Sequence, residues 1–375
     1  MRIQHEVTEI DAAGKKVHVH DLKSGRKFWE SYAQLLIATG ATPICPDLPG
    51  ADAVGIFGVS TLESGLQLHR RLAKGDIKTA VVVGGGYIGL EMAEAMVRLG
   101  LEVSLIDRSP QVMGTLDEDM GVLVSQALRD VGATLYLEET LTAFKTKAGK
   151  VTGIVTDKRT LPADIVILGL GVRPNTMLAA AAGVPLGEKG SIRVNGRMET
   201  GIAGIWAAGD CAESFHLVSR RPFYIALGTV ANRHGRVAGI NLGGGYATFP
   251  GVVGTAVTKI CQVEVARTGL QEKELRKLGL EWVSAVIKSR TKAGYFPGAG
   301  EITVKVLAER GSGRLLGGQI VGMEGSAKRI DTLATALHAG FTVEEMINLD
   351  LGYAPPFSPV WDPVVIAARE AAKLL

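Results

Sequence analysis

The stretch VVVGGGYIGLEMAEAMVRLGLEVSLIDR, residues 81–108, decides the fold class. An apolar strand leads into Gly84-x-Gly86-x-x-Gly89, a helix follows, and a second apolar strand ends in Asp107. Glycines at these positions permit a tight turn, a close approach of the backbone to a pyrophosphate, and close packing of helix on strand. The helix N-terminus then presents unpaired N–H groups to the phosphates. The stretch therefore predicts a Rossmann-type dinucleotide site.

Asp107 indicates which dinucleotide the site prefers. A carboxylate at the tip of the second strand accepts hydrogen bonds from ribose hydroxyls and disfavours a 2′-phosphate. NADH is therefore the predicted ligand. Arg108 beside it keeps NADPH as the alternative.

Composition excludes several classes of protein. The chain has 375 residues, 46% of them hydrophobic, with 41 Lys and Arg against 38 Asp and Glu. No basic run is interleaved with aromatic residues, so nucleic acid is not an expected partner. No apolar run approaches the ~18 residues of a membrane span, and the N-terminal segment does not resemble a signal peptide. The cysteines, Cys45, Cys211 and Cys261, have no metal-type spacing, so no metal site is predicted and each is expected to be a small buried residue in a reducing cytoplasm.

The pattern of elements predicts an α/β protein. Residues 1–42 read as β-rich, strands and helices alternate from residue 79, and a separate α+β unit begins near residue 251. Alternation of this kind indicates a parallel sheet that is covered on both faces.

Three further strand ends carry recognisable motifs. ATG at 38–40, GLGVRPN at 169–175 and IWAAGDCAE at 205–213 each follow an apolar run. Gly-Asp after a strand is also a common turn or helix cap. Together, the three ends are predicted to converge at one sheet edge, where doubly wound folds bind ligands.

The order ATGATP, GGGYIGLE, GVRPN, AAGD resembles the FAD- and NAD-dependent pyridine nucleotide–disulfide oxidoreductases. The segments GTAVTKI, AGYFPG, KRID and YAPPFSPVWDPV are similar to the branch that contains coenzyme A disulfide reductases and NADH oxidases. The resemblance covers nearly the whole chain. It implies two Rossmann-like nucleotide-binding domains, the FAD domain incomplete, plus a C-terminal α+β dimerisation domain. The implied segments are 1–50 for the remaining FAD-binding part, 51–77 for a connector, 78–195 for the NAD(H)-binding domain, 196–248 for a second FAD-binding segment and 249–375 for dimerisation.

The resemblance also implies roles for individual residues. Those implied for FAD are Thr39, Gly40, Gly209 and Asp210, with Asp210 on the ribityl chain. Those implied for NADH are Gly84, Gly86, Tyr87, Ile88, Gly89, Glu91, Asp107 and Gly171, with Glu91 and Gly171 near the nicotinamide half. Tyr295 and Tyr353 occupy the positions of the family's catalytic tyrosines, where a phenol protonates or hydrogen-bonds to a leaving thiolate.

Two hallmarks of the family are missing from the sequence. No GxGxxG precedes Gly84 to hold the ADP half of FAD, and none of the three cysteines occupies the position of the redox cysteine. Two interpretations remain open. Either Met1 is not the true start, with about half of a ~150-residue domain lying before it, or the chain begins there and holds FAD poorly.

The functional prediction is a homodimeric flavoprotein that passes electrons from NADH through FAD to a disulfide (coenzyme A disulfide or polysulfide) or to oxygen or peroxide. The alternative is an FAD-deficient, truncated remnant that binds NADH and dimerises without turnover. A redox signalling protein similar to apoptosis-inducing factor ranks below both, because the KRID and YAPPF segments are not expected in it.

Overall fold

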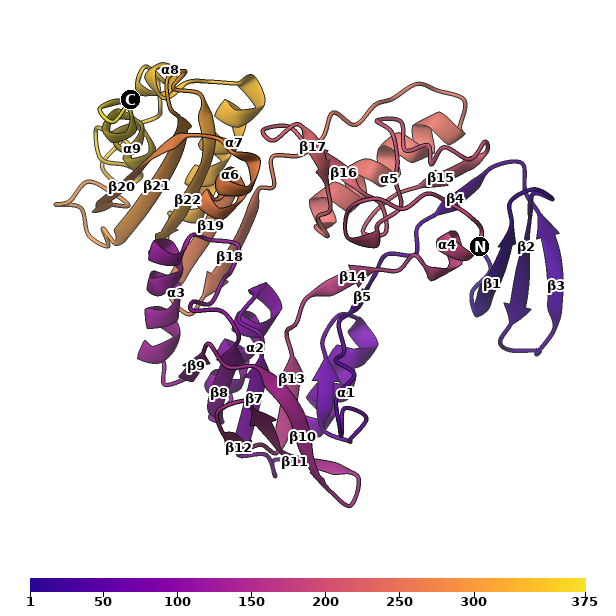
Figure 1. Ribbon diagram of the computed structural model, residues 1–375. Helices are drawn as coiled ribbons and strands as arrows, with labels where there is room; N and C mark the ends of the chain where they lie inside the picture. Colours follow the sequence, from indigo (N-terminus) through magenta and orange to yellow (C-terminus); the bar gives the residue numbers. More distant parts are fainter. The chain divides into compact units, whose positions relative to one another are not determined.

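The computed structural model describes residues 1–375 and divides into two compact units. The first unit holds residues 1–42 and 172–252, and the second holds residues 43–171 and 253–375. Both can be followed in Figure 1 by colour and label.

Short strands dominate the first unit. An antiparallel meander comprises β1 (His5–Asp11), β2 (Lys16–Asp21) and β3 (Lys27–Ser31). Three two-stranded sheets follow: β4 (Leu35–Ile37) with β15 (Ile205–Ala207), β5 (Ala41–Pro43) with β14 (Val172–Pro174), and β16 (Ser214–His216) with β17 (Arg221–Phe223). The helical elements are α4 (Met177–Ala181), η1 (Glu188–Gly190) and α5 (Gly228–Leu242).

The apolar positions of these strands form the core of the first unit. Val17 and Val19 lie two residues apart on β2, so both point to the same face, where they pack with Ile10 and Ile37. β1 and β2 form an antiparallel hairpin, which agrees with the β-rich character expected of residues 1–42, and the strand predicted before ATG is confirmed as β4.

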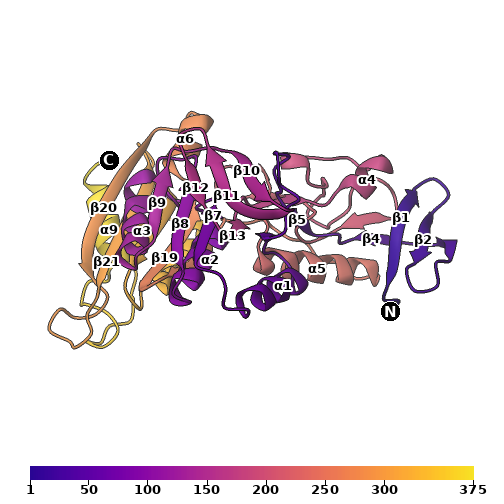
Figure 2. The ribbon, with the colours of Figure 1, turned by 90° about the horizontal axis from the view of Figure 1, so that it is seen from below.

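The second unit contains the predicted parallel sheet. Its strands, in spatial order, are β6 (Ile56–Gly58), β13 (Ile165–Leu168), β7 (Thr79–Val83), β8 (Glu102–Asp107) and β9 (Thr134–Leu137). All neighbouring strands run parallel, and Figure 2 shows β7, β8 and β13 from below. The associated helices are α1 (Leu62–Leu72), α2 (Tyr87–Arg98) and α3 (Glu118–Asp130).

An antiparallel sheet packs against the parallel one. It consists of β10 (Leu141–Lys147), β11 (Lys150–Thr156) and β12 (Thr160–Pro162). Phe144, Val151 and Ile154 from this sheet pack against Val81 and Val166 of the parallel sheet. The parallel strands are thus apolar on both sides, as buried parallel strands should be.

The C-terminal part of the second unit is a five-stranded antiparallel sheet with helices. In spatial order the strands are β18 (Ala256–Ile260), β19 (Val263–Gly269), β22 (Leu315–Gly322), β21 (Glu301–Glu309) and β20 (Trp282–Arg290). The helical elements are α6 (Glu272–Leu278), η2 (Ala327–Arg329), α7 (Ile330–Ala339), α8 (Val343–Ile347) and α9 (Pro363–Ala372). β21 and β22 form an antiparallel hairpin, and the predicted α+β character of this part is confirmed.

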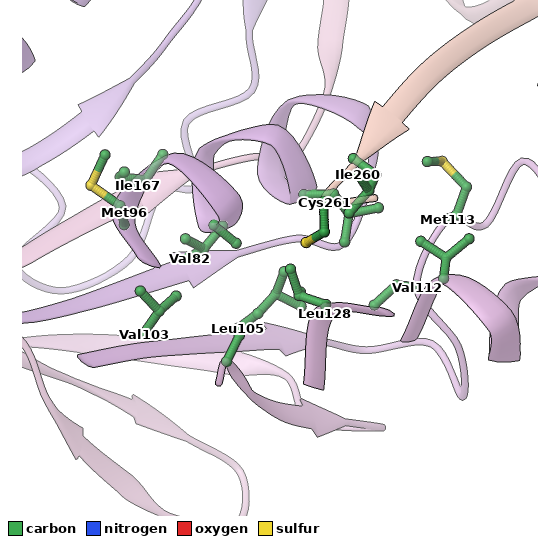
Figure 3. Packing of buried hydrophobic residues seen from close by; sticks show 14 of the residues in the cluster. Val82, Met96, Val103, Leu105, Val112, Met113, Leu128, Ile167, Ile260 and Cys261 are labelled. Carbon is green, nitrogen blue, oxygen red and sulfur yellow. The ribbon is translucent and has the colours of Figure 1, made fainter. Parts of the chain in front are cut away.

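One hydrophobic core joins the C-terminal sheet to the parallel-sheet region. Ile260 and Cys261 lie among Val82, Met113 and Leu128 (Figure 3). Both regions belong to the second unit, in agreement with this shared core.

Two global features concern burial and membranes. Cys211 and Cys261 are buried, but Cys45 is exposed, so the expectation of burial was wrong for Cys45. Cys45 lies two residues after the short strand β5, in an irregular segment that also contains Pro46 and Pro49. None of the helices combines the length and the apolar character that a membrane crossing requires.

Candidate functional site: two nucleotide-binding elements and a tyrosine pair

The glycine loop between β7 and α2 has the close packing that its motif predicts. Gly84 has a φ of 102°, in the left-handed region that favours glycine. A Cβ atom on Gly89 would lie 1.8 Å from the carbonyl oxygen of Gly84, and one on Gly84 would lie 2.5 Å from the carbonyl oxygen of Gly169. Glycine at these two positions is therefore required for α2 to approach β7 and the end of β13.

The start of α2 is open to a ligand. Gly86 is the N-cap residue, and no side chain caps the helix. A Cβ atom on Gly86 would meet nothing closer than 3.9 Å. The N–H groups of the first helical turn, including those of Tyr87 and Ile88, have no acceptor within the helix and carry its positive dipole end. This geometry suits a pyrophosphate.

Asp107 ends β8 beside the glycine loop. Its Oδ2 accepts a hydrogen bond from the Gly85 N–H at 2.6 Å, and its Oδ1 accepts one from the Ser109 N–H at 2.7 Å. These bonds orient the carboxylate, and each oxygen retains a second lone pair. The carboxylate is thereby placed at the carboxyl end of the sheet, where a ribose hydroxyl donates in folds of this type.

Glu91 and Gly171 lie further along the same region. Glu91 is exposed, one turn after Tyr87 on α2, and its Oε1 accepts a hydrogen bond from Thr258 Oγ1 at 2.6 Å. Gly171 follows β13 with a φ of 88°, and its carbonyl oxygen accepts from the Ile44 N–H at 2.9 Å. The Tyr87 hydroxyl accepts from Thr115 Oγ1 at 3.3 Å.

Two of the three predicted strand ends meet in the first unit, those before ATG and AAGD, whereas the strand before GLGVRPN is β13 of the parallel sheet in the second unit, so the prediction of a single sheet edge was wrong. β4 and β15 pair in parallel, and the Ala208 N–H donates to the Ile37 carbonyl at 3.0 Å just beyond them. The Asn175 N–H donates to the Gly40 carbonyl at 2.9 Å, and Thr39 Oγ1 donates to the Asn175 carbonyl at 2.5 Å. GLGVRPN therefore contacts ATG, and AAGD contacts the strand that leads into ATG, although the chain separates these segments widely.

Asp210 has a carboxylate oxygen without a partner. Its Oδ1 is buried and makes no hydrogen bond, and burial raises the pKa of this carboxyl group. Tyr224 Oη donates instead to the Asp210 main-chain carbonyl at 2.9 Å, and burial raises the pKa of Tyr224 to about 12. Buried acceptors in native proteins are nearly always paired, so an unpaired one indicates a donor supplied by a ligand or water.

The surroundings of Asp210 fit the polar part of a flavin nucleotide. Gly209 has a φ of 81°, and a Cβ atom there would lie 3.7 Å from Ala231 Cβ on α5. The N-terminus of α5, a helix of 15 residues, has no side-chain cap. A hydroxyl-rich chain is the kind of ligand that gives Asp210 its missing donor.

The two predicted catalytic tyrosines are brought together. They come from segments 58 positions apart, and the neighbouring Tyr295 side chain raises the pKa of Tyr353 by favouring its protonated form. Both are accessible, with 79% of Tyr295 and 48% of Tyr353 exposed. Two adjacent phenols of this kind form a donor–acceptor pair that is open to a reactant.

Two polar contacts of α2 were not predicted from the sequence. Thr258 binds Glu91, and the Cys261 N–H donates to Glu94 Oε2 at 2.7 Å. Each pair is separated by 167 positions, so no local pattern indicates it. No group of three or more His, Cys, Asp or Glu side chains is arranged to hold a metal ion.

Comparison with known families gives two matches. Residues 1–235 match the pyridine nucleotide-disulphide oxidoreductase family, and residues 255–363 match the pyridine nucleotide-disulphide oxidoreductase dimerisation domain.

Individual relatives match over almost the whole chain. An NAD(P)H sulfur oxidoreductase (CoA-dependent) of Pyrococcus abyssi is 39% identical over 370 residues, which cover 98% of this chain and 81% of that protein. An NADH oxidase of Methanocaldococcus jannaschii is 37% identical over 98% of this chain and 82% of that protein. The solved structure of an NAD-dependent persulfide reductase from A. fulgidus matches with a TM-score of 0.95 and 38% identity, over 99% of this chain and 69% of that one.

These matches confirm the family that the motifs predicted and the α/β fold with its C-terminal dimerisation domain. The chain belongs to the pyridine nucleotide-disulphide oxidoreductase family.

Proposed function

We propose that the protein is an FAD-dependent oxidoreductase that takes electrons from NADH and passes them to a sulfur–sulfur bond. The observation that carries the proposal is the buried, unpaired Oδ1 of Asp210 in one unit, together with a complete dinucleotide loop in the other. One nucleotide site alone would suit many proteins, whereas two are needed for electron transfer between nicotinamide and flavin.

In this proposal Asp210 holds the ribityl chain of FAD, with Thr39, Gly40 and Gly209 beside it. Two features support the assignment: the missing hydrogen-bond donor of Asp210 and the uncapped N-terminus of α5. Bound FAD would supply the two-electron chemistry, since such cofactors accept a hydride and release electrons to a second substrate. The protein side chains then orient the cofactor and exclude competing water.

NADH would bind at the Gly84 loop. The N–H groups at the start of α2, near Gly86, Tyr87 and Ile88, would hold its pyrophosphate, and Asp107 would accept from the adenosine ribose. Glu91 and Gly171 would lie near the nicotinamide half. NADPH would bind less well, because its 2′-phosphate would approach the Asp107 carboxylate.

Tyr295 and Tyr353 would serve the leaving thiolate. Cleavage of a disulfide by two electrons leaves two thiolates, and a phenol held close to one of them can donate a proton to it. Tyr295 raises the pKa of Tyr353, so the Tyr353 hydroxyl stays protonated and would be able to donate its proton to the thiolate.

A sulfur acceptor is preferred because of the tyrosine pair and the similarity to the CoA-dependent sulfur oxidoreductase of Pyrococcus abyssi. Oxygen is the second candidate, and it is favoured by the similarity to the NADH oxidase of Methanocaldococcus jannaschii. The flavin-free, NADH-binding remnant remains the non-enzymatic alternative.

The proposal extends to organisation and location. Residues 249–375 would form the homodimer interface, and the match to a dimerisation domain supports this. Residues 1–50 and 196–248 would bind FAD, and residues 78–195 would bind NADH. Residues 51–77 would connect the first FAD-binding segment to the NADH-binding domain. The three free cysteines suit a reducing compartment such as the cytoplasm.

The test is an NADH-oxidation assay of FAD-reconstituted protein with coenzyme A disulfide, polysulfide and oxygen in parallel. A sulfur acceptor should give the highest kcat/KM, and Tyr353→Phe should lower that rate by about 10²- to 10⁴-fold, as expected for loss of a general acid. Oxygen as the best acceptor would support the second candidate, and protein that binds NADH but no FAD would support the remnant.

A further inference from the structure

We propose that Thr258 is a positioning residue for Glu91. Through this residue, β18 of the C-terminal sheet holds the Glu91 carboxylate of the dinucleotide-binding helix α2 in a fixed orientation. The inference rests on the proposed function, in which NADH binds at the Gly84 loop. Its starting point is the hydrogen bond of 2.6 Å from Thr258 Oγ1 to Glu91 Oε1.

The direction of Thr258 follows from the alternation of β18. Thr258 is half-buried and Ile260 is buried, whereas Val257 and Lys259 between and beside them are exposed. Residues two apart on a strand share a face, so Thr258 and Ile260 both face the packed side of β18. Ile260 lies in the core that contains Leu90 of α2.

A second contact fixes the register of β18 against α2. The Cys261 N–H donates to Glu94 Oε2 at 2.7 Å, and Arg98 pairs with Glu94 Oε1 at 2.5 Å. Cys261 has a φ of 57°, a conformation that a tightly constrained turn imposes. Glu91 and Glu94 are three residues apart and therefore lie on one face of the helix.

Position along α2 makes Glu91 relevant to the nucleotide. It lies four residues after Tyr87, so it shares a helix face with the first turn that follows the glycine loop. Thr258 engages only Oε1 and leaves Oε2 able to accept a hydrogen bond from a ligand. A free Glu side chain would have to be ordered on binding, and the Thr258 bond orders it beforehand.

Loss of this hydrogen bond should therefore weaken the binding of the nicotinamide half of NADH and leave the binding of the rest of the molecule unchanged. Loss of the Thr258 hydroxyl should weaken NADH binding about 3- to 10-fold, the range expected when one flexible side chain must be ordered on binding. ADP-ribose contains the pyrophosphate and both riboses but no nicotinamide, so its affinity should not change. A general displacement of α2 would weaken both ligands equally.

The experiment compares Thr258→Val with Thr258→Ser in the full chain, by calorimetric titration with NADH and with ADP-ribose. Thr258→Ser keeps a hydroxyl and should restore NADH affinity to within about twofold of wild type. Thr255→Val is the matched control, because the Thr255 hydroxyl contacts Thr268 at 2.7 Å and not α2. If Thr258→Val does not fold, Thr258→Ala provides the same comparison.

A double-mutant cycle completes the test. On a Glu91→Ala background, Thr258→Val should have no further effect on NADH affinity, because no carboxylate remains to be positioned. Equal NADH affinity for wild type and Thr258→Val, equal weakening of NADH and ADP-ribose, or additive effects in the cycle would each overturn the inference. Failure of the wild-type protein to bind NADH at all would instead overturn the proposed function, and the inference with it.

Discussion

Replacing Lys305 by methionine tests how firmly the C-terminal sheet holds the dinucleotide-binding region. The Lys305 side chain is only 3% exposed, and its Nζ lies 3.2 Å from Asp117 Oδ2, 2.9 Å from Asp119 Oδ1 and 2.8 Å from Glu272 Oε1. Burial alone would lower the pKa of Lys305, but the bonds to Glu272 and Asp119 outweigh it and the pKa is raised. The ammonium group is therefore charged and links β21 to the start of α3.

The magnitude follows from what the substitution leaves behind. Removing one partner of a buried ion pair costs about 3–5 kcal/mol. Asp117, 7% exposed, would keep its bond from Gln319 Nε2 at 2.7 Å, and Asp119, 49% exposed, would be rehydrated. We therefore expect a loss at the lower end, about 3 kcal/mol.

Urea unfolding of the full chain, followed by circular dichroism, measures this loss. Lys288→Met is the matched control: Lys288 is exposed on the neighbouring β20, and surface substitutions change stability by about 0.5 kcal/mol or less. Because the folded-state pKa of Lys305 is raised, its contribution is present below the unfolded pKa of about 10.4 and is lost as pH rises through the folded value. A loss for Lys305→Met no larger than that for Lys288→Met would refute the reasoning.

Three further predictions concern the glycine loop, nucleotide choice and acid stability. Gly89→Ala should abolish NADH binding, because the new Cβ would lie 1.8 Å from the Gly84 carbonyl, whereas Gly65→Ala, which meets nothing within 4 Å, should leave NADH affinity unchanged in the same titration. Asp107→Asn should lower the ratio of NADPH to NADH dissociation constants at least about 10-fold, roughly the effect of one lost charge–hydroxyl hydrogen bond; an unchanged ratio would argue against Asp107 as the ribose acceptor. Burial lowers the pKa of His234 to about 4, so between pH 6.5 and pH 4 the unfolded chain binds a proton that the folded chain does not. Stability should fall by about 3 kcal/mol over that range in urea titrations, and His234→Gln should flatten the decline; equal slopes for the two proteins would contradict it.

The dinucleotide-binding loop and its acidic residue could be predicted because their motif is local in the sequence. The loop from Gly84 to Gly89 and the acid at Asp107 lie within 24 consecutive residues, and their roles depend on backbone geometry that glycine alone permits. The turn at Gly209-Asp210 was recognised only together with ATG and GLGVRPN. The structure shows why, since the Asn175–Gly40 and Ala208–Ile37 bonds join segments that the sequence separates widely.

Contacts between distant segments were not predictable. Thr258 reads as an ordinary strand residue, and its bond to Glu91 exists only because β18 packs against α2. Lys305 likewise sits in an apolar strand whose sequence does not indicate that Asp117 and Glu272 surround it. The sequence pattern also did not show that the antiparallel sheet beginning at β10 covers one face of the parallel sheet.

The most direct test of the central claim is anaerobic titration of the FAD-reconstituted protein with NADH, followed by flavin absorbance. We predict that wild-type protein retains FAD through gel filtration and that NADH bleaches it, whereas Asp210→Ala retains much less FAD and still binds NADH. The basis is the buried Oδ1 of Asp210, which has no partner within the chain. A wild-type protein that binds NADH but retains no FAD, or whose bound FAD is not reduced by NADH, would contradict the account.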